Sequence, residues 1–304
     1  MSQIMISQDK RVCDLLPLSV VKVTHLATKP STNTKDWTCL HPLYIEEFVQ
    51  VLARQRIGRA LLPYSVVYGS GVHPGATDDK MISVGLELYG YLATASLGLF
   101  GNWNMRGKDI HRATWNLRLE GGLLDDIFCQ QADALWEIEQ YIVGTIQGQG
   151  LPVRDIEQGR ARLRAGIFVN RRVFCKVRDG KPEKNLAKVG PAAKYHNQWR
   201  IPDTPQLGQR RQDGTIAPCR PERIRRGDFV KVSVQFAVER KIYPRLGNVT
   251  LRLHLNQVIQ LVPAWETGEG KDVQVIPALF IEGDDVEDSQ AEIMVEEPGF
   301  QEIF

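Results

Sequence analysis

Apolar and polar residues alternate along several segments of the chain, as in β-strands that bury one face. This alternation predicts strands at Leu16–Ala27, Leu61–Tyr68, Met81–Leu92 and Ala113–Glu120. It is strictest near the end of the chain, in Asp228–Glu239 and Val249–Val262. Because Pro244 and Gly247 supply a turn between these two segments, we expect them to form a hairpin.

Helical periodicity is clearest over Leu123–Ile146, where apolar residues recur every three or four positions. Asp125 and Asp126 would lie in the first turn of this helix, where negative charge is favourable. A second helix is expected over Leu43–Gln55, because Pro42 is tolerated at a first-turn position and one face of the segment is apolar.

The order of these elements argues against a repeated βαβ unit. Strands come first, one long helix follows between strands, and a hairpin closes the series. This order predicts a mainly β protein with α insertions, built as an OB-fold-like antiparallel barrel. We expect residues 1–281 to form one domain, with a split near Gly150 as the alternative. The segment around 179–223 is expected to be a long insertion with little regular structure, since it is rich in Gly, Pro, Lys, Gln and Arg.

Charge is distributed very unevenly along the 304 residues, although the net charge is only +2. Residues 154–252 contain 24 Lys or Arg and 9 Asp or Glu. Residues 282–304 contain nine carboxylates and no Lys or Arg, and they end on Phe304. A basic body with an acidic tail, expected to be disordered, predicts a body that binds a polyanion and a tail that competes for the same surface. The alternative is a tail that only improves solubility.

Basic and aromatic residues are interleaved in three segments, 103–108, 171–178 and 194–200. Proteins that bind single-stranded nucleic acid need cations for the phosphates and flat side chains on which bases stack. We therefore expect bases to stack on Trp103, Phe174, Tyr195 and Trp199. We expect phosphate contacts from Arg106, Lys108, Arg171, Arg172, Lys176, Arg178, Lys194, Arg200, Lys231 and Arg252. Alternatively, Phe174 and Trp199 are core or loop-anchoring residues and the charges solvate one face. Arg160, Arg162 and Arg164 would share a face if their segment were extended.

The closing hairpin and the tail also resemble a known family. Gly227–Val232 opens a strand after a Pro-Glu-Arg-Ile-Arg-Arg sequence, and Leu251–Val258 reads Leu-Arg-Leu-His-Leu-Asn-Gln-Val. Together with an acidic tail that ends in an aromatic residue, these segments resemble the T7-type phage single-stranded DNA-binding proteins and their relatives in large DNA viruses. The resemblance covers about the last 80 residues. It implies a tail that recruits replication proteins through its acidic residues and its last aromatic, here Glu296, Glu297, Glu302 and Phe304.

The sequence thus predicts a non-enzymatic, sequence-independent single-stranded DNA-binding protein that acts in replication or recombination. DNA is favoured over RNA, and a homo-oligomer is compatible with the sequence. An RNA-coating subunit, either a nucleocapsid or a guide-RNA backbone protein, is one alternative. A metal-dependent nuclease is another, because Pro202-Asp203 and Glu239-Arg240-Lys241 follow a PD…ExK order.

Other features narrow the class of protein. The five cysteines and six histidines are scattered, with no spacing typical of a metal site. Neither a phosphate-binding loop nor a common hydrolase signature occurs. There is no apolar run of bilayer length and no signal-peptide pattern at the start of the sequence. We therefore expect a soluble intracellular protein without a cofactor, a structural metal or a membrane partner.

Overall fold

The structure of the 304-residue chain is a computed structural model. It describes residues 45–52, 65–69, 82–148, 157–176, 190–201, 203–240 and 249–267. All of them belong to the first of two units into which the chain divides, Met1–Lys271. The expected strand Leu16–Ala27, the domain boundary at 281/282 and the acidic tail lie outside the described residues.

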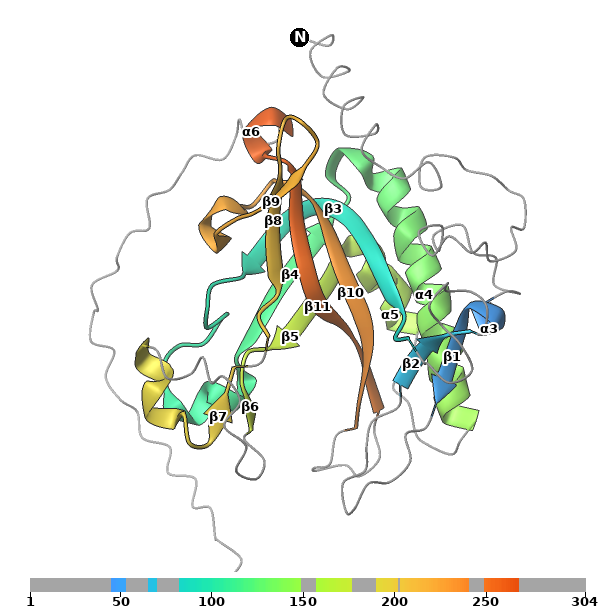
Figure 1. The fold of residues 1–304 in the computed structure, drawn as a ribbon. Coiled ribbons are helices and arrows are strands. Elements are labelled where there is room, and N and C mark those ends of the chain that lie inside the picture. Colours follow the sequence, from blue (N-terminus) through green and yellow to red (C-terminus); the bar gives the residue numbers. More distant parts are fainter. Residues whose placement is uncertain are drawn as a thin grey trace, which may run out of the picture. The chain divides into compact units, whose positions relative to one another are not determined.

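Seven strands form the main sheet, in the order β10–β3–β4–β5–β11–β8–β9 (Figure 1). Their bounds are Gly85–Ser96 (β3), Thr114–Glu120 (β4), Ile167–Arg172 (β5), Gln206–Arg210 (β8), Ile216–Pro218 (β9), Phe229–Arg240 (β10) and Val249–Val262 (β11). The expected hairpin is confirmed, because β10 also pairs antiparallel with β11. The pairings therefore run from β10 through β3, β4, β5 and β11 back to β10, and only β5 and β11 are parallel among these five strands.

Two short antiparallel pairs lie outside this sheet, and helices connect the strands. The pairs are Val49–Leu52 (β1) with Ser65–Tyr68 (β2), and Cys175–Lys176 (β6) with Trp199–Arg200 (β7). The α-helices are Ile45–Phe48 (α3), Asp125–Gly148 (α4), Glu157–Ala165 (α5) and Ala264–Thr267 (α6). Short 3-10 helices are Gly107–Arg112 (η3), Gly122–Leu124 (η4), Gly190–Tyr195 (η6) and Pro221–Arg223 (η7). The prediction of a mainly β protein with a few helices is confirmed.

The structure corrects three expectations about local structure. The helix expected over Leu43–Gln55 ends at Phe48, because the apolar residues of Val49–Leu52 pair with β2 as a strand. Arg160, Arg162 and Arg164 lie on helix α5 and do not share the face of a strand. The segment from Gly190 to Arg223 contains three strands and two 3-10 helices, so it is not irregular where it is described.

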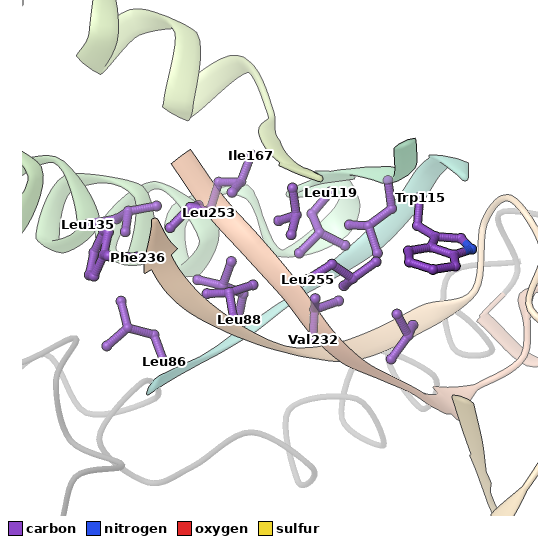
Figure 2. Packing of buried hydrophobic residues seen from close by; sticks show 14 of the residues in the cluster. Leu86, Leu88, Trp115, Leu119, Leu135, Ile167, Val232, Phe236, Leu253 and Leu255 are labelled. Carbon is purple, nitrogen blue, oxygen red and sulfur yellow. The ribbon is translucent and has the colours of Figure 1, made fainter. Parts of the chain in front are cut away.

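The core lies between the inward faces of these strands and α4. Figure 2 shows Leu86 and Leu88 of β3, Trp115 and Leu119 of β4, and Leu253 and Leu255 of β11 packed together with Leu135 of α4. Every second residue of β4 is buried, which is why its alternation was legible in the sequence. Each fully buried side chain of this size contributes roughly 1.5–3 kcal/mol. The core draws on residues before and after Gly150, from Ile45 to Val258.

Helix α4 also satisfies backbone groups of β3. The side chain of Gln131 is almost fully buried, at 1% exposure. Its Oε1 accepts the backbone N–H of Tyr89 at 2.8 Å, and its Nε2 donates to the carbonyl of the same residue at 3.0 Å. Tyr89 lies before the part of β3 that pairs with β4, so Gln131 takes the place of a strand partner there. A polar residue on the apolar face of α4 thereby joins helix and sheet.

Candidate nucleic-acid interface

The outward side chains of β4, β5 and β11 form one continuous surface, here called the outer face. Asn170 of β5 is paired with Asn116 of β4 and with His254 of β11. The inward positions between them, such as Leu117 and Val169, are fully buried. The outer face therefore consists of the alternate residues Thr114, Asn116, Arg118, Glu120, Phe168, Asn170, Arg172, Arg252 and His254.

Phe168 is the aromatic residue of this face, and 45% of its surface is exposed. Its cross-strand partner on β4 is Arg118. On the other side of β5, His254 of β11 is paired with Asn170. Because the two strands are parallel, Arg252, two residues before His254, lies level with Phe168, two residues before Asn170. An exposed ring is thus flanked by guanidinium groups on both neighbouring strands.

Arg118 is held in place beside this ring. Its Nη2 donates to the backbone carbonyl of Ala165 at 2.9 Å and lies 3.1 Å from a carboxylate oxygen of Glu120. Gly166, with φ near +157°, lies so close that a Cβ there would be 2.5 Å from Nε of Arg118. The turn into β5 therefore fixes the guanidinium group against the start of the strand.

At the end of β5 the three basic and aromatic segments singled out in the sequence come together. Trp103 packs edge-on against Phe174, with ring centroids 5.2 Å apart, and against Tyr195 at 6.1 Å. Phe100 stacks on Phe174 at 6.3 Å. These four rings form an aromatic cluster that joins loop 97–113 to segments 173–176 and 190–201. Sequence reasoning selected the segments separately, and tertiary packing unites them.

The aromatic cluster is closely packed at the glycines of loop 97–113. Gly101 has a φ of +56°, and a Cβ there would lie 2.3 Å from the carbonyl oxygen of Thr114. A Cβ on Gly107 would lie 2.2 Å from the hydroxyl oxygen of Tyr195. The indole N–H of Trp103 donates to the carbonyl of Arg106 at 2.9 Å. The loop is thereby held against segment 190–201.

Burial separates the aromatic residues expected to stack on bases. Trp103 and Phe174 are 7% and 2% exposed. Their faces are covered by other rings, so stacking on nucleic acid by these two residues does not fit the structure, and Phe174 is the core residue that the alternative allowed. Tyr195 and Trp199 are partly exposed. Trp199 pairs with Lys176 across β6 and β7.

The expected phosphate contacts gather mainly around the outer face and the aromatic cluster. Arg172 and Arg252 lie on the outer face itself. Arg106, Lys176 and Lys194 have exposed side chains beside the cluster, and Arg200 is partly exposed there. The ammonium group of Lys194 lies 5.1 Å from the centroid of the Tyr195 ring.

Two expected phosphate contacts are engaged elsewhere. Arg171 points to the same face of β5 as the buried Ile167 and Val169, not to the outer face. Its Nη1 donates to the carbonyl of Leu255 at 3.5 Å. Burial lowers the pKa of Arg171, and the charge of Asp203 opposes this shift. Lys231 lies on β10 and forms an ion pair of 3.0 Å with Glu87. Its charge is therefore offset within the protein.

Several expected residues lie outside the described part of the chain. These are Arg178, the side chain of Lys108, and the tail residues Glu296, Glu297, Glu302 and Phe304. Of the nuclease alternative, Pro202 and Lys241 are outside the described residues, and so is the side chain of Glu239. Within the described ranges, no three His, Cys, Asp or Glu side chains gather where they could hold a metal ion. The helices of the described segments are too short or too polar to span a bilayer.

Phe168 and Arg118, which lie on the outer face, were not among the site residues expected from the sequence. Phe168 alternates with the buried Ile167 and Val169, and Arg118 occupies a polar position between the buried Leu117 and Leu119 of β4. The sequence does not reveal that β4 pairs with β5, because the 24 residues of α4 and the whole of α5 lie between these strands in the chain.

No protein-family model and no curated protein matches the chain. Among solved structures, gp2.5, a single-stranded DNA-binding protein encoded by bacteriophage T7, aligns with a TM-score of 0.34 at 11% identity and covers 59% of this chain and 87% of that one. The single-stranded DNA-binding protein from bacteriophage Enc34 aligns with a TM-score of 0.27 at 11% identity and covers 71% and 91%. The same protein in complex with single-stranded DNA gives 0.26 at 10% identity, covering 70% and 96%. TM-scores of this size do not establish a shared fold, so the function has to be argued from the residues.

Proposed function

We propose that the protein binds single-stranded DNA without sequence specificity, through the outer face of β4, β5 and β11. The observation that carries this proposal is the exposed ring of Phe168 between Arg118 and Arg252. A base of any identity can stack on this ring, because every base has a π-face. In this proposal Arg252 contacts a flanking phosphate, and Arg118 does so by exchanging its ion pair with Glu120 for a phosphate.

The binding surface continues along β5 to the aromatic cluster. Arg172 pairs with Thr114 at the start of β4, and Thr114 accepts the backbone N–H of Asn102 from loop 97–113. Arg106, Lys176 and Lys194 then extend the cationic surface, and the partly exposed Tyr195 and Trp199 offer further stacking positions. A strand of nucleic acid can thus follow β5 from Phe168 to this second set of cations.

The pairing of five strands in a ring supports an OB-type barrel as the scaffold. In this arrangement the parallel pair β5 and β11 lies beneath the outer face. OB-folds bind oligonucleotides on one face of the barrel and the loops around it. Loop 97–113, which joins β3 to β4, is such a loop. In this proposal the protein is not an enzyme, acts in DNA replication or recombination, and needs no cofactor.

The acidic tail is proposed to compete with DNA. Its nine carboxylates in residues 282–304 are tethered to the basic body, so their effective concentration at the outer face is in the millimolar range for a flexible linker. DNA that displaces the tail would release Glu296, Glu297, Glu302 and Phe304 to contact replication proteins.

Binding of the full-length protein to oligo-dT and to a hairpin duplex tests the proposal. We expect tighter binding to oligo-dT, and a logarithm of affinity that falls linearly with the logarithm of salt, by about 0.7 for each phosphate neutralised. An oligo-U of the same length reports on RNA, and we expect it to bind more weakly than oligo-dT. Equal affinity for the duplex, or binding to neither, would contradict the proposal.

A further inference from the structure

A groove of about 680 Å³ lies away from the aromatic cluster, at the far end of β11. Its walls are residues 209–213 of the β8–β9 hairpin and residues 261–266 around the start of α6. Figure 1 shows α6 beside this hairpin, at the opposite end of the sheet from β6 and β7. A volume of this size is typical of sites that hold a small ligand or one unit of a polymer.

Trp265 is the most exposed large apolar side chain among the described residues, at 65%. Tryptophan is enriched at binding interfaces, where its ring is covered and its N–H finds a hydrogen-bond partner. Its position in the groove is set by buried groups rather than by a loose terminus. Asp228, 1% exposed, accepts the backbone N–H of Ala264 at 2.8 Å.

The same carboxylate ties α6 to the preceding strands. Asp228 also accepts the backbone N–H of Arg225 at 2.7 Å and the side-chain amide of Gln260 at 2.6 Å. Gln260 in turn donates to the carbonyl of Arg223 at 3.1 Å. This buried network holds the first turn of α6, and therefore the backbone of Trp265, against β11 and the turn before β10.

Two arginines, Arg210 and Arg211, line the groove. Segment 220–226, whose backbone is tied to α6 through Asp228, carries four more exposed arginines outside this lining: Arg220, Arg223, Arg225 and Arg226. The groove also contains the carboxylates of Asp213 and Glu266, so its lining has two acidic and two basic side chains. Asp213 accepts hydrogen bonds from the N–H and hydroxyl of Thr215, at 2.9 and 2.7 Å. Cations near an exposed indole are the combination that single-stranded nucleic acid requires.

The groove lies farther along β11 than the residues of the outer face. The register of β10 with β11 is irregular at two points between His254 and Val262, and Leu261, at the second of them, lines the groove. Leu261 is seven residues beyond His254, a distance of roughly 23 Å along a strand. A strand of nucleic acid bound at the outer face therefore needs several further nucleotides to reach Trp265.

We propose that the groove between the β8–β9 hairpin and α6 is a second binding site for single-stranded nucleic acid, in which a base stacks on Trp265 and the adjacent phosphates contact Arg210 and Arg211. This inference rests on the proposed function of the outer face and extends its site. Nucleic acid that passes from the outer face along β11 to Trp265 takes a different path from nucleic acid that follows β5 to the aromatic cluster. The total length of nucleic acid covered is accordingly larger than the outer face alone would give.

Oligonucleotides that lack bases at one end distinguish binding at this groove from binding at the outer face. The full-length protein is titrated with dT10, with dT20, and with 20-mers in which ten nucleotides at one end or the other are abasic; about ten nucleotides fall within the range that one OB-type site covers. We expect dT20 to bind more tightly than at least one abasic 20-mer. Trp265→Ala should remove that difference, lowering dT20 affinity roughly fivefold to 100-fold, the range for loss of one stacked base, while Trp265→Phe retains most of it.

Three further variants separate the two sites. Phe168→Ala should weaken every oligonucleotide, dT10 included, whereas Trp265→Ala should leave dT10 unchanged. Arg210→Gln with Arg211→Gln should weaken both the dT20 and the abasic 20-mer and flatten the salt dependence; Arg162→Gln on α5 is the control and should change neither. If the wild type binds dT20 and both abasic 20-mers equally, and Trp265→Ala has no effect, the groove is not a nucleic-acid site although the outer face stands. If no oligonucleotide binds, both proposals fail.

Discussion

At the scale of single residues, the proposed DNA-binding surface depends on which aromatic side chains are exposed. Trp103 and Phe174 are interleaved with cations in the sequence, but their rings pack against Phe100 and Tyr195 and belong to the core. Phe168 carries no such sequence signature and is exposed. The buried rings instead hold loop 97–113 and segment 190–201 in place, so they position the cations around them.

Phe168→Ala should weaken oligo-dT binding by about 1–3 kcal/mol, because one stacked base loses its platform. Phe168→Tyr should retain most of the affinity, since it preserves the ring. The measurement is fluorescence anisotropy with labelled dT at fixed salt. Leu123→Ala is the control. Leu123 is equally exposed, at 45%, but lies in the 3-10 helix η4 and not on the outer face. Loss of the same affinity in both Ala variants would contradict a specific role for Phe168.

At the scale of elements, helix α5 shows how charge and helical spacing act together. Arg160 and Arg164, four residues apart, both contact Asp133 of α4, at 3.0 and 2.6 Å. Hydrogen bonds from Arg164 lower the pKa of Asp133 to about 2. Two of the basic residues that the sequence suggested as a nucleic-acid face are thus used to fasten α5 to α4. Leu163, buried between them, supplies the apolar contact.

We expect Glu139 of α4 to make the stability of the fold depend on pH. Burial raises the pKa of Glu139 from its ordinary 4.5 to about 7, and the charge of Arg162 opposes the shift. A carboxyl with a raised folded-state pKa binds a proton more tightly in the folded protein. Its ionisation therefore destabilises the fold progressively as the pH rises from about 4.5 to about 7, and this cost is absent below that window.

Glu139→Gln removes the ionisation and should flatten this part of the pH profile. Relative to the wild type, the variant should gain in free energy of unfolding between pH 5 and pH 8. Urea unfolding followed by circular dichroism at the two pH values measures the difference. An identical difference between variant and wild type at both pH values would show that Glu139 does not titrate in this window.

Local periodicity predicted those elements whose pattern agrees with their packing. Thr114–Glu120, Asp125–Gly148 and the β10–β11 hairpin were recognisable because one face of each is buried. The pattern failed for α5, where alternating Arg and apolar residues fit a strand as well as a helix, and the contact with Asp133 decides. It also failed at β8, a strand within a Gly- and Gln-rich segment whose structure depends on parallel pairing with β11.

At the scale of the whole molecule, the sequence predicts a class of ligand, whereas the surface proposed to bind it depends on long-range strand pairing. The uneven charge and the three basic and aromatic segments pointed to nucleic acid, and these segments do come together in space. The outer face was not predictable, because it is made by pairing β5 with β4 across α4 and α5 and with β11, which is more than 70 residues away. Such long-range pairings leave no local pattern.

Deletion of residues 282–304 should tighten oligo-dT binding, because it removes an intramolecular competitor with nine carboxylates. The gain should be largest at low salt and shrink as salt screens the tail. Parallel titrations of the full-length and truncated proteins over a salt series measure it. A control in which the tail carboxylates are replaced by amides should behave like the deletion; unchanged affinity in both would remove the proposed competition.

The most direct test of the outer face is to find where bound DNA touches the protein. Oligo-dT is photo-cross-linked to the full-length protein, and the modified peptides are identified by mass spectrometry. We expect an adduct at Phe168, in the strand Ile167–Arg172. Unlabelled oligo-dT added as a competitor should abolish this adduct. Efficient cross-linking confined to other surfaces, with none in this strand, would contradict it.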